Sequence, residues 1–360
     1  MTVLLFIAVL ALLVVGHELG HMLMAKLMGM KVVEFGIGFP PRIAGRKWGE
    51  TEYTINWLLF GGFVRILGED DTSNDPRAMH RRPVVAQGLV LLAGPGMNFV
   101  LAFVLFFAAY LVGVPGAIDP AQPIPPEARV VIEEVLPGSP AAHAGLKPGD
   151  EVVSLAINGH TTPVRVPDTI AGAVSSTDGP VTITLIRNHE PLTYVVAPRA
   201  GIVPDAPTHR AIGIATALVG VTHFSIIAAM RAAVVATYTN TVGILTSLLM
   251  LIGHALTLSA DLTGVAGPVG IAGMTGSAAA FGLGSLLSFI ALLSINLGVI
   301  NLLPFPALDG GRILFLMLET IARRRIPLRV ANWTNALGFG LLIALMMVVT
   351  WHDIVRLIGN

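Results

Sequence analysis

The sequence predicts a polytopic α-helical membrane protein with about four spans and one extramembrane α+β domain. Hydrophobic residues make up 54% of its 360 residues and charged residues only 12%, a composition too apolar for a water-soluble chain. Residues 84–118, 262–308 and 330–352 contain no Asp, Glu, Lys or Arg, and residues 1–25 contain only Glu18. Because about 20 apolar residues cross the hydrocarbon core of a bilayer, each block is long enough to span it.

The first apolar block is expected to remain in the protein as a membrane helix. It has no basic residues before its apolar run, and the run continues through Gly16 to Lys26 without a small-residue cleavage site. A cleavable signal peptide would carry both features.

Net charge and cysteine content exclude several classes of protein. The formal net charge is zero, so no basic excess indicates a nucleic-acid partner. The chain contains no Cys, which excludes disulfides, thiolate metal sites and cysteine nucleophiles.

The basic residues orient the predicted helices. Residues 26–83 contain nine Lys or Arg, and Arg323, Arg324, Arg325 and Arg329 crowd the last loop between apolar blocks. The positive-inside rule therefore places both loops in the cytoplasm.

Residues 117–210 differ in composition from the apolar blocks. They carry six Lys or Arg against ten Asp or Glu, and they contain strand-like runs such as residues 181–186. Pro-rich stretches at 120–126 and 198–207 flank them. The pattern predicts a small folded domain on the extracytoplasmic side.

Two histidines in the first block have the spacing of metal ligands. His17 and His21 are four residues apart, so on a helix they project from one face about one turn apart. Imidazoles bind Zn²⁺, the ion lowers the pKa of its water toward about 7, and a carboxylate such as Glu18 can take and return a proton. The alternatives are a chance match or two buried histidines satisfied by neighbouring helices. An ionisable residue inside a span is costly, which favours a functional role for Glu18.

A third ligand has to come from elsewhere, because catalytic zinc usually has three protein ligands and one open position. Asp309 is the candidate. It follows Pro304 and Pro306, which interrupt an apolar block, and a broken helix at membrane depth is tolerated where it lines a cavity or packs in protein. The alternative is that Asp309 caps a helix that starts near Gly310.

The three ligands must lie at one membrane depth, and this constrains residues 211–260. Only Arg231 interrupts the two apolar runs there. A lone additional span would separate Asp309 from the histidine pair by most of the hydrocarbon core of about 30 Å. We therefore expect residues 221–257 to form an amphipathic or re-entrant segment, which leaves four spans in total.

Two motifs together resemble the site-2 protease family of intramembrane metalloproteases, in its bacterial regulator-of-sigma-E protease type. The first is His-Glu-Leu-Gly-His at residues 17–21, and the second is Asn-x-x-Pro-x-x-x-Leu-Asp-Gly at residues 301–310. Their occurrence in this order is specific, and the resemblance covers essentially the whole chain.

The resemblance implies roles for individual residues. His17, His21 and Asp309 would bind one zinc ion per chain, and Glu18 would be the general base. Asn301 would contact the substrate or help to unwind it, since a helical substrate must become extended before water can reach its peptide bonds.

A second element of the resemblance lies in the second span. Gly94 and Asn98 match the Gly-x-x-x-Asn element of the family, which implies that both act at the substrate. The alternatives are that Gly94 allows close helix packing and that Asn98 makes an interhelical hydrogen bond.

A third element resembles the membrane-dipping β-hairpin of the family. It is the run Gly-Gly-Phe-Val-Arg that begins at Gly61 and Gly62. A hairpin formed by residues 52–67 could pair with an extended substrate by strand addition, with the two glycines at the substrate edge. The alternative for these glycines is an ordinary turn.

Residues 129–198 resemble a PDZ domain of the bacterial protease type. They contain Gly-Leu-Lys-Pro-Gly-Asp at 145–150, an apolar strand, a turn at Asn158 and Gly159, a short helix around 167–176 and a hairpin. A PDZ groove binds peptides by strand addition. The alternative, which we prefer because no groove is visible in a sequence, is a passive filter that limits which substrates approach the membrane site.

The predicted organisation has four parts. They are an N-terminal membrane region with the cytoplasmic-side hairpin loop (1–116), a PDZ domain with Pro-rich linkers (117–210), an amphipathic or re-entrant linker (211–283) and a C-terminal membrane region (284–360).

The resemblance implies a multi-pass protein of a bacterial plasma membrane, with its zinc toward the cytoplasm and its PDZ domain outside. It would act in regulated intramembrane proteolysis on single-span proteins that a first cut has shortened, including anti-sigma-factor-like or signal-peptide-like segments. The alternative is a non-enzymatic membrane scaffold or a metal transporter. Transporters typically place discontinuous helices in paired repeats, and the motif at 301–310 has no second copy. Neither alternative needs Glu18 beside the metal.

Overall fold

The fold is described from a computed structural model that covers residues 2–69, 73–118, 124–125, 128–187, 190–202, 209–257, 266–324 and 326–358. The chain divides into two compact units, residues 1–112 with 224–360, and residues 113–223. The Pro-rich stretches expected at 120–126 and 198–207 lie partly outside the described residues, as does Arg325.

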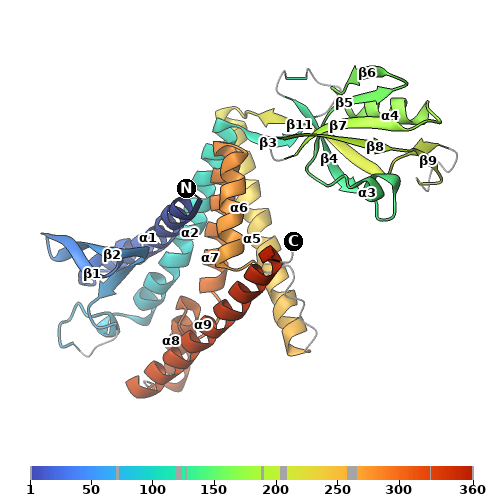
Figure 1. The fold of residues 1–360 in the computed structure, drawn as a ribbon. Helices are drawn as coiled ribbons and strands as arrows, with labels where there is room; N and C mark the ends of the chain where they lie inside the picture. Colours follow the sequence, from blue (N-terminus) through green and yellow to red (C-terminus); the bar gives the residue numbers. More distant parts are fainter. Residues whose placement is uncertain are drawn as a thin grey trace. The chain divides into compact units, whose positions relative to one another are not determined.

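The first unit is built from long apolar helices. Five of them, α1, α2, α5, α7 and α9, are long and apolar enough to cross a membrane, as judged by length and composition over the described residues. The helices are α1 (Thr2–Leu27), α2 (Val84–Val112), α5 (Ile226–Leu256), α6 (Pro268–Ala280), α7 (Leu283–Asn301), α8 (Asp309–Ala322) and α9 (Leu328–Ile358) (Figure 1). A short 3₁₀ helix, Met79–Arg81, precedes α2.

Helix α5 differs from the sequence-based expectation. Residues 221–257 were expected to be an amphipathic or re-entrant helical segment; α5 is a continuous helix within this range, and its length and composition also allow it to cross a membrane. Five candidate spans therefore stand among the described residues, against the four expected. The physical reason is the position of Arg231 within the first two turns of α5, because a long charged side chain near a helix end can reach toward the headgroups.

Helix α6 keeps the predicted ligands at one depth despite the additional candidate span. α5 begins beside the end of α2, where the Phe224 amide donates to the Tyr110 carbonyl at 3.1 Å. α6 then returns the chain to the N-terminal end of α1, since Gly276 lies against Thr2. α7 consequently starts at the same end of the bundle as α1 and runs in the same direction (Figure 1).

Helices α1, α2 and α7 approach one another closely through small residues. A Cβ atom at Gly20 would lie 2.2 Å from the carbonyl oxygen of Ala93, and one at Gly298 would lie 3.3 Å from Cβ of Asn98. The Ser294 hydroxyl donates to the Asn98 carbonyl at 2.8 Å. Such packing is the main source of helix association in a bilayer, where apolar surface gains little from contact with apolar surface.

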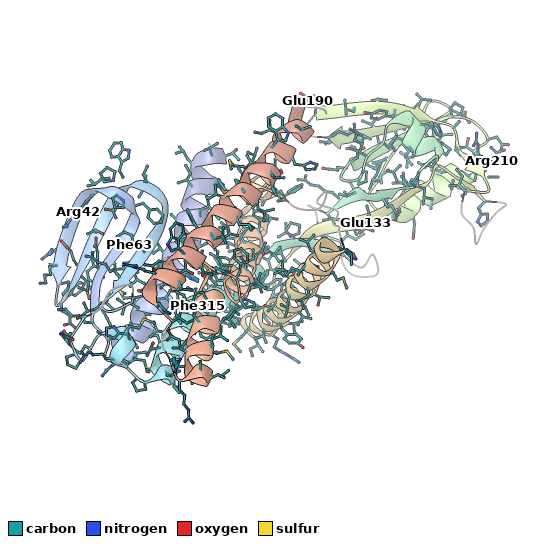
Figure 2. The ribbon with its side chains drawn as sticks, turned by 90° about the horizontal axis from the view of Figure 1, so that it is seen from below. Arg42, Phe63, Glu133, Glu190, Arg210 and Phe315 are labelled. Atoms are coloured by element: carbon teal, nitrogen blue, oxygen red, sulfur yellow. The ribbon has the colours of Figure 1, made fainter. Side chains whose placement is uncertain are left out.

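A long antiparallel hairpin follows α1 in sequence. Its strands are β1 (Val32–Trp48) and β2 (Thr51–Ile66), and it reverses direction at Gly49, whose φ is +65°. The rings of Phe39 and Phe63 stack across the two strands, with centroids 6.3 Å apart. Figure 2 shows the hairpin with Arg42 and Phe63 labelled.

The hairpin extends from Val32 to Ile66 and is therefore longer than the expected range, residues 52–67. Gly61 and Gly62 lie inside β2 at the point where this long strand folds back, because Ile37 of β1 is paired both with Ile55 and with Gly62; a turn at the glycines is compatible with this register. Cβ atoms built on them would lie 3.5 Å from Val14 and 3.4 Å from Val15, respectively. The two glycines therefore bring β2 close to α1.

The second unit is a mixed α+β domain around one seven-stranded sheet in the order β3-β11-β4-β5-β7-β8, with β6 paired to β5. Val130, Ile132, Leu155, Ile183 and Leu185 are among its core residues. The strands of the sheet are β3 (Val114–Ala117), β4 (Arg129–Val135), β5 (Glu151–Ile157), β6 (His160–Pro163), β7 (Val181–Arg187), β8 (Glu190–Val196) and β11 (Ile214–Thr222). The helices are α3 (Pro140–Ala144) and α4 (Pro167–Ser175), and β9 (Arg199–Ala200) pairs with β10 (Arg210–Ala211).

Local expectations for this unit are confirmed at two positions. Asn158 and Gly159 join β5 to β6 with φ values of +52° and +82°, as a tight hairpin turn requires. Helix α4 occupies the range expected for a short helix. The unit extends to residue 223 rather than 210, because β11 pairs with both β3 and β4 and so joins β3 to the rest of the sheet.

An ion pair secures the turn at residues 145–150. Asp150 is 1% exposed and accepts two hydrogen bonds from Arg187, Nε to Oδ1 at 2.6 Å and a terminal nitrogen to Oδ2 at 2.7 Å. The Lys147 amide also donates to Oδ2, and Arg187 donates to the Gly145 carbonyl. The carboxylate therefore ties the turn to β7.

Replacing Asp150 by Ala should loosen this unit, because the Arg187 guanidinium and the Lys147 amide lose their acceptor. We expect the free energy of local opening, measured by hydrogen exchange of β5 and β7 amides in the full chain, to fall by about 3 kcal/mol. The control is Glu151→Ala, which removes the partner of the 64% exposed Arg129 and should change the free energy of local opening by less than about 1 kcal/mol. Equal effects of the two substitutions would contradict a special role for Asp150.

Candidate metal centre

The side chains of His17, His21 and Asp309 meet inside the first unit. The Nε2 atoms of the two histidines are 3.1 Å apart, and Oδ2 of Asp309 lies 3.0 Å from the first and 3.3 Å from the second. The histidines are only 6% and 7% exposed. The structure thus brings together, from opposite ends of the chain, the three residues that the sequence predicts as ligands.

The donor atoms of this cluster suit a metal ion. Nδ1 of His21 lies 2.8 Å from the Val90 carbonyl oxygen, which can only accept, so Nδ1 carries the proton and Nε2 carries a lone pair. Oδ2 of Asp309 is buried without a hydrogen-bond partner. Lone pairs that converge in a buried place repel one another unless a cation lies between them. Two imidazoles and one carboxylate are a known set of ligands for zinc.

The main chain around Asp309 presents its carboxylate to the histidines. Asp309 is the first residue of α8; Leu308 is the cap residue, and no side chain caps the helix. The alternative that Asp309 caps this helix is therefore wrong. Cβ atoms at Gly310 and Gly311 would lie 2.1 Å and 2.2 Å from the carbonyl oxygens of Leu303 and Phe305, so only glycines allow this tight entry into α8.

Gly94 on α2 lies directly against the two imidazole rings. A Cβ atom built on it would be 2.2 Å from Nε2 of His21 and 2.8 Å from Nε2 of His17. The absence of a side chain at residue 94 leaves room for the histidines and for an ion between them.

Asn98, one turn further along α2, contacts the other ring nitrogen of His17. It is fully buried, and its Nδ2 lies 3.1 Å from Nδ1 of His17, while its Oδ1 has no hydrogen-bond partner. The Gly-x-x-x-Asn element therefore supports both histidines from the neighbouring helix.

Glu18 is held by the hairpin. The Val64 amide of β2 donates to Oε2 of Glu18 at 3.0 Å, and a Cβ atom at Gly62 would lie 3.9 Å from Cγ of Glu18. Glu18 follows the ligand His17 directly on α1. One oxygen is anchored by the main chain, which leaves the other to act on a proton.

The remaining predicted residues do not contact the ligand cluster. Asn301 is the last residue of α7, is half-buried, and its side chain makes no hydrogen bond within the described part of the chain. Gly61 packs against Phe39 and Val14.

Sequence reasoning missed the main-chain groups that complete the site. The Val90 carbonyl sets the tautomer of His21, and the Val64 amide holds Glu18. Because nearly every residue carries the same main-chain groups, the amino-acid sequence does not indicate which of them will contact the site. Gly20, inside the first motif, did offer a signal, because a small residue on a membrane helix commonly marks a close crossing.

These features define an integral membrane protein with a buried centre of two histidines and one carboxylate beside a glutamate. The model of peptidase family M50 matches residues 5–345, and the chain belongs to this family. The resemblance to site-2 proteases is thereby confirmed.

Curated relatives cover nearly the full length of the chain. A Clostridium perfringens protein, named provisionally as a zinc metalloprotease, is 36% identical, with 95% of each chain covered. The zinc metalloprotease RasP of Geobacillus kaustophilus is 31% identical over 97% of this chain and 96% of its own. The regulator of sigma-W protease RasP of Bacillus subtilis is 30% identical over 99% of both. The chain is a metalloprotease, and by the names of these relatives its metal is zinc.

Replacing Gly94 by Ala should expel the metal, because the added methyl group occupies the space of the imidazole rings. We expect zinc affinity, measured by competition with a chromogenic chelator, to fall by at least about 100-fold. Gly96→Ala is the matched control on the same helix, since its Cβ atom would meet nothing within 4 Å. Ala favours helix more than Gly, so weakened helix formation cannot explain a loss. Wild-type affinity in Gly94→Ala would show that the rings do not occupy this position.

Proposed function

We propose that this chain is an intramembrane zinc endopeptidase that hydrolyses peptide bonds in or near membrane-spanning segments of other proteins. The observation that carries the proposal is the meeting of His17, His21 and Asp309 between long apolar helices, with Glu18 beside them. His17, His21 and Asp309 would hold one zinc ion. Zinc bound there supplies Lewis-acid polarisation of the scissile carbonyl and lowers the pKa of a water molecule.

Glu18 performs the proton transfers in this proposal. Its Oε2 stays on the Val64 amide, and the free carboxylate oxygen takes a proton from the attacking water and returns it to the leaving nitrogen. The main-chain anchor fixes the direction of the carboxylate, so that it does not need to reorganise between the two transfers.

Asn98 orients His17 in this proposal, in place of the substrate contact expected from sequence. If His17 binds the metal through Nε2, its ring proton is on Nδ1, and this N–H group needs a hydrogen-bond acceptor. Rotating the Asn98 amide by 180° places Oδ1 on Nδ1 and gives this orphaned oxygen its partner. Gly94 makes space for the same rings.

Asn301 and the hairpin are proposed to receive the substrate. The side-chain amide of Asn301 could hydrogen-bond the main-chain groups that a substrate helix exposes when it unwinds. β2 contacts Glu18 through Val64, so an extended segment paired with this part of the hairpin would lead to the carboxylate of Glu18. Gly61 and Gly62 allow this approach of β2 to α1.

The physiological setting is proposed from the relatives. The Bacillus subtilis relative is named a regulator of sigma-W protease, which favours regulated intramembrane proteolysis of pre-trimmed single-span substrates of the anti-sigma-factor type. We place the protein in a bacterial plasma membrane, with residues 26–83 in the cytoplasm and the unit of residues 113–223 outside. That unit is proposed to be a PDZ domain that filters substrates.

Replacing Glu18 by Gln should abolish cleavage while zinc is retained, because the amide cannot take a proton but the ligands are intact. We expect the rate of cleavage of a single-span model substrate in detergent to fall by at least about 100-fold, with zinc content unchanged. Glu52→Gln, on the hairpin strand that holds Glu18 but paired with Arg42, is the control and should cut normally. A fully active Glu18→Gln variant would remove Glu18 from the mechanism, and a zinc-loaded wild type that cuts no substrate would favour a scaffold or transporter.

Asn98 can be tested by metal affinity rather than by activity. Asn98→Leu removes the acceptor for His17 with little change in volume and should weaken zinc binding by about 10–100-fold in a chelator competition. Asn98→Asp keeps an oxygen acceptor and should bind zinc much more tightly than the Leu variant. If both variants bind zinc like the wild type and only KM for substrate rises, Asn98 contacts the substrate instead.

A further inference from the structure

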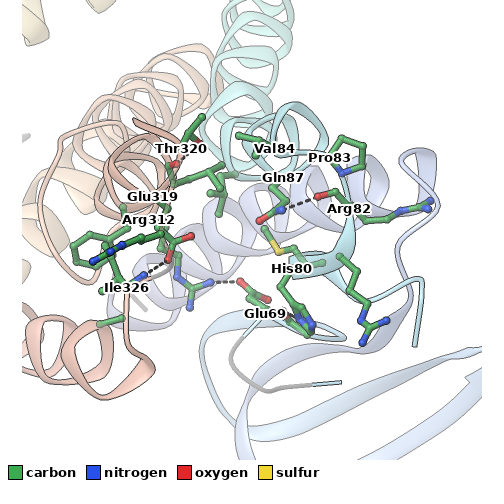
Figure 3. A pocket seen from close by; sticks show the side chains of 18 of the residues that line it. Glu69, His80, Arg82, Pro83, Val84, Gln87, Arg312, Glu319, Thr320 and Ile326 are labelled. Carbon is green, nitrogen blue, oxygen red and sulfur yellow. Dashed lines mark hydrogen bonds and ion pairs between the residues drawn. The ribbon is translucent and has the colours of Figure 1, made fainter. Parts of the chain in front are cut away.

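A pocket of about 850 Å³ lies in the first unit, away from the three ligands of the metal centre (Figure 3). Its walls come from the segment that leads into α2, from α8, and from the first turns of α9. The proposed catalytic mechanism makes no use of this space.

The charges that line the pocket are predominantly positive. Five arginines line it, against the carboxylates of Glu69 and Glu319. Arg312 is paired with Glu69, and Glu319 accepts the Ile326 amide at 2.8 Å (Figure 3). The other four arginines are Arg81, Arg82, Arg323 and Arg324.

None of these four guanidinium groups has a carboxylate partner within the described part of the chain. Arg81 donates to the side-chain oxygen of Asn74, and Arg82 donates to the Met28 carbonyl. Arg323 has φ +52° at the end of α8, so that the chain turns there and places it with Arg324 at the rim. Arginines that line one pocket and have no acidic partner are suited to an oxyanion, above all a phosphate.

The remaining wall of the pocket is apolar. Val84, Leu91, Phe315 and Leu316 line it, from α2 and α8. A small hydrated anion would gain nothing from such a wall, whereas an amphipathic anion would use both parts of the pocket.

The pocket also lies at the level where candidate spans end. Val84 is the first residue of α2, and the apolar span of α9 begins at Arg329, two residues after the lining residue Pro327. The ends of membrane spans coincide with the lipid headgroups. The phosphate of a phospholipid is therefore the anion available at this depth.

We propose that this pocket binds one anionic phospholipid. The phosphate would lie among Arg81, Arg323 and Arg324, and the upper part of an acyl chain would lie on Leu91 and Phe315. Basic pockets between membrane helices bind anionic headgroups in this manner. Because α8 carries both Asp309 and Phe315, the lipid would brace the helix that begins at the metal ligand.

The test uses the purified full chain and native mass spectrometry in detergent, titrated with phosphatidylglycerol or phosphatidylcholine. The variant is Arg323→Gln with Arg324→Gln. The control is Arg46→Gln with Arg329→Gln, which removes the same number of exposed basic charges outside the pocket. Zinc content verifies that each variant is folded.

The wild type and the control should bind phosphatidylglycerol at least about 10-fold more tightly than phosphatidylcholine. In the pocket variant the affinity for phosphatidylglycerol should fall by about 10–30-fold, so that the preference disappears. A second variant, Phe315→Ser, should weaken phosphatidylglycerol binding while all arginines remain. Equal losses in the pocket variant and the control would overturn the proposal, since general surface charge would then explain binding.

Competition separates the lipid from other anions. Inorganic phosphate should displace phosphatidylglycerol only at concentrations far above that of the lipid, because it lacks an acyl chain. Displacement by phosphate at equal concentration would show a small-anion site, and displacement by a short polyglutamate peptide at lower concentration than the lipid would show a peptide site. Either result would overturn the proposal.

Discussion

The structure depends on a single constraint, which is that three donor atoms from α1 and α8 converge within a few ångströms in an apolar bundle. A carboxylate and two imidazoles are expensive to bury unless a cation compensates them. The path of α5 and α6, the broken segment before α8 and the glycines of α2 all serve to bring these atoms together. The bundle is thus organised around polar groups that would otherwise oppose its formation.

Glycine provides much of the required space, and for reasons that differ from site to site. Gly94 keeps α2 clear of the imidazole rings, Gly20 lets α1 cross α2, and Gly310 permits the tight turn into α8. In each case the cause is a neighbouring atom that a Cβ would meet, rather than a special backbone angle. The motif glycines are therefore part of the metal centre in a steric sense.

The hairpin connects the surface of the membrane unit with its chemistry. One strand supplies the amide that holds Glu18, and the same strand approaches α1 through two glycines. An extended peptide beside this hairpin would lie near Glu18, to which we assign the proton transfers in our proposal. For the arginine-lined pocket we propose a different role, because it lies where spans begin and carries charge suited to the headgroups.

The sequence by itself determined the class of protein, the family, and the identity of the ligand candidates. Composition and charge-free blocks depend only on residue type, and two histidines four residues apart share a helix face wherever the helix lies. Tertiary structure alone decided that Gly94 and Asn98 support the histidines and that Val64 anchors Glu18. These outcomes depend on helix crossings and on main-chain groups, which every residue possesses and which therefore leave no mark in the sequence.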